Sequence, residues 1–145
     1  IKFPVAFAIV PVNPFIEVAF ESMGVRSFEY TFNFTPKSKE ETEEVKAIIQ
    51  LFRFHMVPEL KGTNHRYLTL PSTFDIHYMY QSSPEVTKEN TYYNKIATCV
   101  LEDCNVNYAP TGIKSFDDGA PTQITMTLRF METEMLTKEK VNKGF

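Results

Sequence analysis

The side chains that could perform chemistry in this chain are three histidines and two cysteines: His55, His65, His77, Cys99 and Cys104. Histidine and cysteine are the usual zinc ligands, and a thiolate beside an imidazole is a common nucleophile. The spacing Cys-x4-Cys without a second pair fits no zinc pattern. Cys99 also lies among apolar neighbours, where we expect a buried structural thiol. The pattern therefore predicts no catalytic residue, no metal and no cofactor.

One weaker constellation stays open as an alternative. An enzyme built from Asp75, His77 and Cys99 requires these side chains to meet in one pocket, and the sequence does not show whether Cys99 is near the other two. Asp117 and Asp118, followed by glycine, resemble the start of a calcium loop but lack its later ligands, so we interpret them as a turn. The five glycines are scattered and form no phosphate-binding loop.

Length and composition limit the class of protein. The chain has 145 residues, one domain by size, and its net charge of −3 argues against a dedicated nucleic-acid binder. Two cysteines make no disulfide scaffold, so we expect reduced thiols in an intracellular setting. The apolar opening, residues 3–12, is about half of the ~20 residues that a membrane span needs and is expected to be an edge strand or arm. Because the chain begins at Ile1, we expect it to be a piece of a longer protein.

The clearest element is a helix over residues 38–57. Ser38 and Glu41 form a capping box, and further glutamates follow in the first turns, where the helix dipole favours carboxylates. Pro58 ends the helix. Apolar side chains recur at spacings of three and four, which predicts one apolar stripe: Val45, Ile48, Ile49, Phe52 and Met56.

Alternating polar and apolar residues predict strands around this helix, at 26–35, 66–70, 73–80, 92–101 and 122–130. A bulge or tight turn is expected at Glu102 and Asp103, before Val106 and Tyr108 resume the alternation. Polar loops are expected at 81–90 and 109–121. The predicted fold is α+β, mainly β, with an antiparallel sheet that folds over on itself and the helix packed at one edge or face of it. We expect one domain over residues 1–137 and a tail or linker over 138–145.

The stretch over residues 106–137 is distinctive and reads VNYAPTGIKSFDDGAPTQITMTLRFMETEMLT. It resembles the C-terminal tube-like domain of baseplate proteins in contractile-tailed bacteriophages. Upstream segments agree, including NPFIEVAFESMGVRSFEYTFNFTPKSKEE, RYLTLPSTFDIHYMY and NKIATCVLEDCNVNYAP. Over roughly residues 13–137 the chain is similar to the tail-tube initiator and tail-tube cap proteins of T-even-like phages, relatives of the tail tube protein.

The resemblance implies a structural virion protein and not an enzyme. It implies the tube-protein fold, a sandwich or barrel of two antiparallel sheets, one of which lines the channel, with one flanking helix. It implies a homo-hexameric ring in the tail baseplate that templates tube assembly and continues the DNA channel. The implied partners are other baseplate proteins and the tail tube protein, with DNA only in passage and no membrane. Assembly is expected in the host cytoplasm. The alternative is an adaptor or binding domain of a phage tail that does not oligomerise, or another non-catalytic interaction module.

A channel wall that bound phosphates tightly would stall DNA, because each Lys or Arg contact strengthens binding. We therefore expect the polar faces of the two clearest strands to line the lumen, rather than simply to face solvent on a monomer: Ser27, Glu29, Thr31, Asn33, Gln123, Thr125, Thr127 and Arg129. Two polar loops are candidate contacts to a neighbouring subunit or ring, through Ser83, Glu85, Lys88, Lys114, Asp117 and Asp118.

Overall fold

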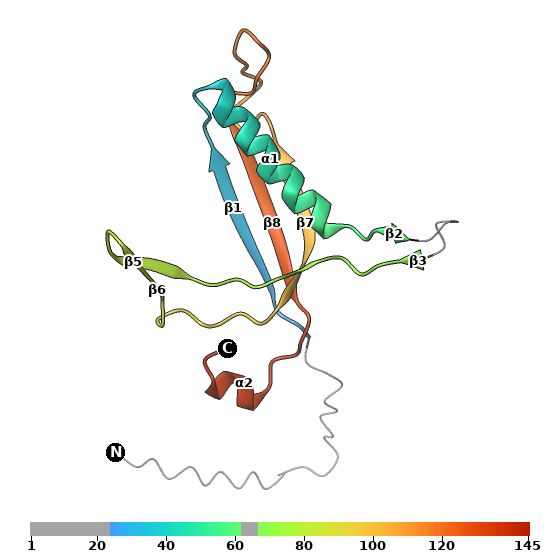
Figure 1. Ribbon diagram of the computed structural model, residues 1–145, viewed down its shortest axis with the longest axis vertical. Helices are drawn as coiled ribbons and strands as arrows, with labels where there is room; N and C mark the ends of the chain where they lie inside the picture. The colour runs from blue at the N-terminus through green and yellow to red at the C-terminus, as the bar shows by residue number, and fades with distance from the viewer. Residues whose placement is uncertain (1–23, 62–66) are drawn as a thin grey trace, which may run out of the picture.

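The computed structural model describes residues 24–61 and 67–145. The expected arm at 3–12, the loop around residue 63 and His65 lie outside these residues. The fold is mixed α+β with antiparallel sheets, which confirms the predicted class. A four-stranded sheet has the order β1-β8-β7-β4, with β1 Ser27–Phe34, β8 Ile124–Glu132, β7 Cys99–Asn107 and β4 Thr73–Phe74. Helix α1 (Lys39–Met56) lies across one face of this sheet (Figure 1).

Helix α1 begins and ends where the sequence predicts. The Ser38 hydroxyl accepts a hydrogen bond from the Glu41 amide (3.2 Å), as an N-cap should. The Glu41 carboxylate accepts in return from the Lys37 amide (2.7 Å), one residue before the position that a standard capping box uses. The helix ends at Met56, and Val57 is its extended C-cap, because Pro58 disfavours a helical conformation in the residue before it.

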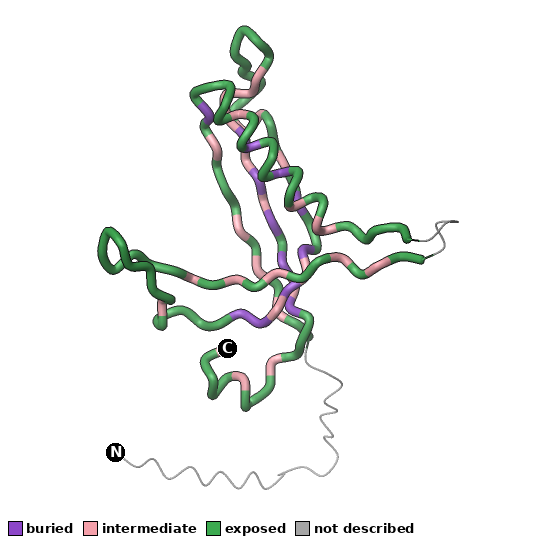
Figure 2. Tube along the Cα trace, in the orientation of Figure 1, coloured by how far each residue is buried: buried purple, intermediate pink, exposed green. Residues whose placement is uncertain are grey.

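The core lies between α1 and the two central strands. Figure 2 shows buried residues along β8 and β7 and on the inner side of α1. On α1 the most deeply buried side chains are Val45 and Ile49. They pack in one cluster with alternate residues of the sheet: Cys99, Leu101, Cys104, Ile124, Met126, Leu128 and Phe130.

The predicted bulge explains how β7 keeps one apolar face. Cys99 and Leu101 are buried before the bulge, and Cys104 is buried after it, so the inward positions change from odd to even numbers. The pairing with β8 shifts between Leu101 and Asp103, which leaves Glu102 as the extra residue. An inserted residue reverses the alternation, and here it returns the later apolar side chains to the face that α1 covers.

Four expectations about strand boundaries are wrong. The strand expected at 66–70 is shorter, since β3 spans only Tyr67–Leu68, and that expected at 73–80 divides into β4 and β5 (Met79–Ser83). The loop expected at 81–90 contains β6 (Val86–Glu89), which pairs with β5 around a tight turn at Pro84. The strand expected from 92 begins only at Cys99, because the preceding tyrosines have no partner strand among the described residues.

Two short ribbons project from the end of the sheet (Figure 1). One pairs β2 (Leu60–Lys61) with β3, and the other pairs β5 with β6. Every residue of these four strands is exposed. Both faces of each ribbon lie in water, so the hydrophobic alternation that reveals a strand is weak there.

The segment expected to be a tail forms helix α2, Lys138–Asn142, capped by the Thr137 hydroxyl. The Lys95 amide donates a hydrogen bond to the Gly144 carbonyl (2.7 Å), which attaches the end of the chain to the segment before β7. No helix in the described residues has the length and apolar character needed to cross a membrane.

Candidate functional site

The two strands with predicted polar faces are neighbours in the sheet, and their polar residues share one face. The β1–β8 register places Thr31 opposite Thr127 and Asn33 opposite Thr125. Cross-strand partners point to the same side of a sheet. Tyr30 and Leu128 alternate with these polar residues along the two strands and pack in the core that α1 covers. The polar residues therefore point to the opposite side of the sheet. Seven of the eight expected residues therefore form one surface: Ser27, Glu29, Thr31, Asn33, Thr125, Thr127 and Arg129.

Gln123 is the eighth residue and lies just before β8. Its side-chain oxygen accepts a hydrogen bond from the Thr111 hydroxyl (3.1 Å), so it contacts the loop over residues 109–121.

The polar face continues onto β7, which the sequence analysis did not include. Asp103, Asn105 and Asn107 pair with Arg129, Thr127 and Thr125 of β8. All three β7 residues are exposed. The alternation of these three polar residues with Cys104 and Val106 is the sequence signal that indicates this face. The bulge at Glu102 interrupts that alternation, so it does not continue from the earlier part of the strand. We call the surface formed by the outward side chains of β1, β8 and β7 the polar face.

Hydroxyl and amide groups dominate the hydrogen bonding on the polar face. The Thr125 hydroxyl donates to the Asn33 side-chain oxygen (2.8 Å), and the Thr31 and Thr127 hydroxyls lie 3.3 Å apart. A hollow of about 520 Å³ opens beside Asn105 and Asn107. These neutral groups can exchange hydrogen bonds with water or a passing solute.

The charges on the polar face lean toward acid. Glu29 lies opposite Arg129 in the register. The Arg129 Nε atom, however, lies 3.2 Å from the Glu102 carboxylate, contributed by the bulge. With Asp103 added, three carboxylates accompany one guanidinium on this surface. A surface of this composition repels phosphate, since Lys and Arg carry the attraction.

The six candidate contact residues lie in two separate places, and all six are exposed. Ser83, Glu85 and Lys88 are on the β5–β6 ribbon. Lys114, Asp117 and Asp118 are on the loop over residues 109–121, at the end of the sheet where α1 begins (Figure 1).

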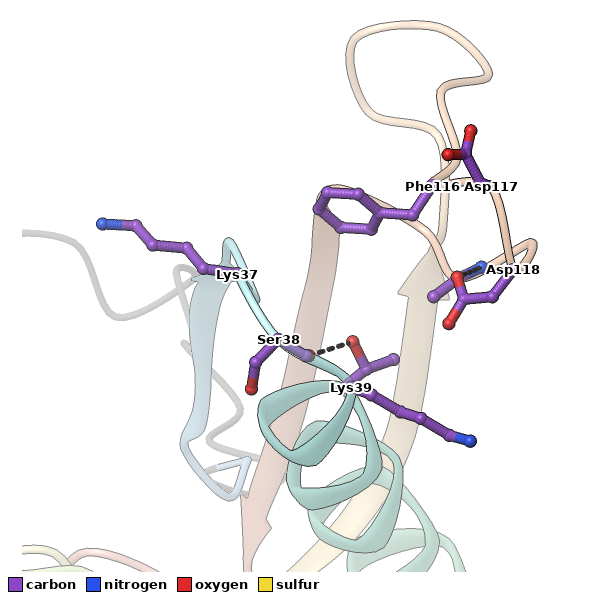
Figure 3. A pocket seen from close by; sticks show the side chains of 8 residues that line it. Lys37, Ser38, Lys39, Phe116, Asp117 and Asp118 are labelled. Atoms are coloured by element: carbon purple, nitrogen blue, oxygen red, sulfur yellow. Dashed lines mark hydrogen bonds between the residues drawn. The ribbon is translucent and has the colours of Figure 1, made fainter.

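A hollow of about 320 Å³ separates this loop from the first turn of α1. Figure 3 shows Asp117 and Asp118 on the loop side and Lys37 and Lys39 on the helix side of the hollow. The Asp118 carboxylate accepts from the Ala120 amide (3.1 Å), which is the turn chemistry that the sequence indicated.

A buried ion pair joins Arg26, the residue before β1, to Glu132, the last residue of β8. Glu132 is 2% exposed, at a core-facing position of β8, and accepts from the Arg26 guanidinium through both oxygens (2.8 and 2.7 Å). It also accepts from the Ala97 amide (2.9 Å), while Arg26 donates to the Lys95 carbonyl (3.2 Å). Burial by itself raises the pKa of Glu132, but the bonds from Arg26 and Ala97 and the nearby positive charges hold it below its ordinary value.

The three residues of the alternative enzyme site engage different partners. Asp75 accepts from the Thr98 hydroxyl (2.8 Å), and His77 lies 3.4 Å from the Glu89 carboxylate. The Cys99 thiol is fully buried and donates to the Ala97 carbonyl (3.1 Å). Burial raises the pKa of Cys99 to about 11, which favours an unreactive thiol. In the described parts of the chain, no three His, Cys, Asp or Glu side chains gather as metal ligands would.

Comparison of the chain with protein-family models and with curated proteins finds no match.

Proposed function

We propose that this chain is a structural subunit of a ring at the base of a contractile phage tail. Six copies surround a channel, template the tail tube and contact other baseplate proteins. The observation that carries the proposal is the polar face, a sheet surface on the side opposite α1 that has few positive charges and is largely exposed among the residues that the structure describes. The DNA channel needs such a wall, because tight phosphate contacts would slow the genome.

The exposed ribbons and sheet edges provide independent support for assembly. An isolated two-stranded ribbon is marginally stable in water, yet two of them project here with every strand residue exposed. Among the described residues, β1 pairs on one side only, so its other edge offers unpaired backbone groups to another chain. In a closed ring, every copy meets its neighbour through the same contacts.

The test is the mass and shape of the full-length chain, alone and mixed with its baseplate neighbours, by light scattering and negative-stain microscopy. We expect six-fold rings with a central hole in at least one condition. A strict monomer in both conditions would exclude the ring and leave the adaptor alternative.

A pair of lysine variants tests which surface faces the channel. Asn33→Lys places a cation on the polar face, and Gln50→Lys places one on the exposed side of α1. Rings of Asn33→Lys should retain duplex DNA in a salt-sensitive way, whereas Gln50→Lys rings should behave like the parent. Equal retention by both variants would contradict a lumenal polar face.

A further inference from the structure

The hydrophobic pattern of β1 does not by itself specify how the strand pairs with β8. The inward positions of β1 carry four aromatic side chains in succession: Phe28, Tyr30, Phe32 and Phe34. They pair with four apolar residues of β8: Phe130, Leu128, Met126 and Ile124. Side chains alternate with a period of two, so a displacement of β1 by two residues keeps every aromatic ring inward and every polar residue outward. Alternation therefore specifies which face is buried but leaves a second register open.

The link from β1 to α1 restricts the direction of such a displacement. Residues 35–38 form this link. A shift toward the helix would pair Pro36, which has no N–H group to donate, with Ile124 and would leave only two residues for the turn. The reverse shift lengthens the link by two residues, which costs little loop entropy. We call its product the alternative register, in which Phe32 replaces Phe34 opposite Ile124.

The Arg26–Glu132 pair distinguishes the two registers. It extends the β1–β8 ladder by one position, and the Glu132 amide donates to the Arg26 carbonyl (2.9 Å). Among the described residues, Glu132 is the only buried charged side chain. In the alternative register, Gly24 would lie opposite Glu132, and Arg26 would lie opposite Phe130. The buried carboxylate would then lose both guanidinium bonds, and a buried charge without its partner is strongly destabilising.

Hydrogen bonds between neutral side chains also depend on the register. The Tyr30 and Tyr78 hydroxyls lie 2.6 Å apart, and the Thr125 hydroxyl donates to the Asn33 side chain (2.8 Å). The second bond is exposed, so water can replace it. A bond between neutral groups is also weaker than a bidentate bond between charged groups, such as the one that Glu132 accepts. The ion pair is therefore the strongest contact that favours the observed register.

We propose that the Arg26–Glu132 pair determines the register of β1, by excluding the alternative register that the aromatic pattern also allows. Fixing register is the best-attested use of buried polar groups, which often add little to stability compared with apolar residues. Among the described residues, β1 is an edge strand, and a shift of two residues would move its free edge by about 7 Å. The inference depends on the sheet alone and not on the proposed ring.

Moving the arginine by two residues tests this role. The double variant Gly24→Arg/Arg26→Phe places a guanidinium opposite Glu132 only in the alternative register, where the new phenylalanine continues the aromatic row. A Cβ atom at Gly24 meets no atom within 4 Å, so the position has room for a side chain. We expect β1 to shift by two residues in this double variant. The matched control is Gly24→Arg alone, which retains Arg26 and should keep the observed register.

Pairs of cysteines on the polar face report the register. Thr31 lies opposite Thr127 in the observed register and would lie opposite Thr125 in the alternative register. Thr31→Cys/Thr127→Cys therefore reports the first and Thr31→Cys/Thr125→Cys the second, because diagonal neighbours are about 7–8 Å apart, too far for a disulfide. The native thiols do not interfere, since Cys99 and Cys104 are buried. Peptide mapping of the oxidised full-length chain measures how fast each disulfide forms.

In the parent and in Gly24→Arg, the Thr31/Thr127 disulfide should form about tenfold faster than the Thr31/Thr125 disulfide. In Gly24→Arg/Arg26→Phe this preference should reverse. A folded double variant that keeps the preference of the parent would overturn the proposal.

A second variant decides the question if the first does not fold. Arg26→Met/Glu132→Gln removes both charges and keeps an acceptor for the Ala97 amide. We expect a cooperative urea transition and rates for the two disulfides within about threefold of each other, because neither register is then excluded. A preference like that of the parent would show that other contacts hold the register. Loss of folding in both variants would also overturn the proposal, since the pair would then be required for folding itself.

Discussion

The sheet–helix body and the two ribbons are built from the same chain but are stabilised differently. In the body, Met126 and Leu128 are 1% exposed and α1 lies over them. In the ribbons, every strand residue is exposed, and hydrogen bonds between two short strands are the main internal support. Burial of apolar area is the main driving force of folding, so the body should carry most of the stability of the isolated chain. Within residues 24–61 and 67–145, the ribbons have no comparable burial.

The same substitution in both regions gives the largest expected contrast. Met126→Ala should lower the free energy of unfolding by about 2–5 kcal/mol, since it removes a buried side chain and leaves a cavity. Met79→Ala, on β5 at 54% exposure, should change it by less than about 0.5 kcal/mol. Urea denaturation measures both. Equal costs would mean that the ribbon is packed in the isolated chain.

Two glutamate-to-glutamine variants compare a buried ion pair with an exposed one. Glu132→Gln leaves Arg26 without its charged partner and should cost about 2–3 kcal/mol. Glu102→Gln removes the exposed contact with Arg129 and should cost less than about 1 kcal/mol. Urea denaturation at neutral pH gives both values, and a larger cost for Glu102→Gln would contradict the assignment of the buried pair as the stronger one.

The pH dependence of the same variants sharpens this comparison. Because the pKa of Glu132 is lowered on folding, its ionised form stabilises the folded chain at neutral pH. That stabilisation should decline as the pH falls below the ordinary carboxyl value of 4.5 and disappear below the lowered pKa. The parent should therefore lose its advantage over Glu132→Gln in acid. A constant difference from neutral to acid pH would exclude this role for the carboxylate.

Removal of a helix cap gives the smallest expected contrast. Ser38→Ala removes the acceptor for the Glu41 amide and should cost about 1 kcal/mol, because α1 covers the core. Thr137→Ala removes the equivalent cap of α2, which has no buried residue, and should cost only a few tenths of a kcal/mol. Thermal unfolding of the two variants against the parent measures the difference. A larger loss for Thr137→Ala would show that α2 belongs to the cooperative body.

The sequence predicted best where one face of an element is buried. The limits of α1, the strands β1 and β8 and the bulge at Glu102 all follow from alternation, capping residues or proline. The same alternation correctly assigned most of the polar face. It predicted poorly over residues 75–98, because a ribbon exposed on both faces has no apolar stripe to detect.

By itself, the sequence determined the local elements and which side of each strand is polar, since both depend on neighbours within a few residues. Only the tertiary structure decided which strands pair. It placed the polar residues of β1, β8 and β7 on one surface and brought Arg26 to Glu132, 106 positions away. Among the described residues it also left a hollow lined by Tyr30, Phe32 and Phe74 beside α1, and it left the strands of both ribbons exposed. These features depend on pairing between distant segments, and the hydrophobic pattern records that a face is buried without recording what covers it.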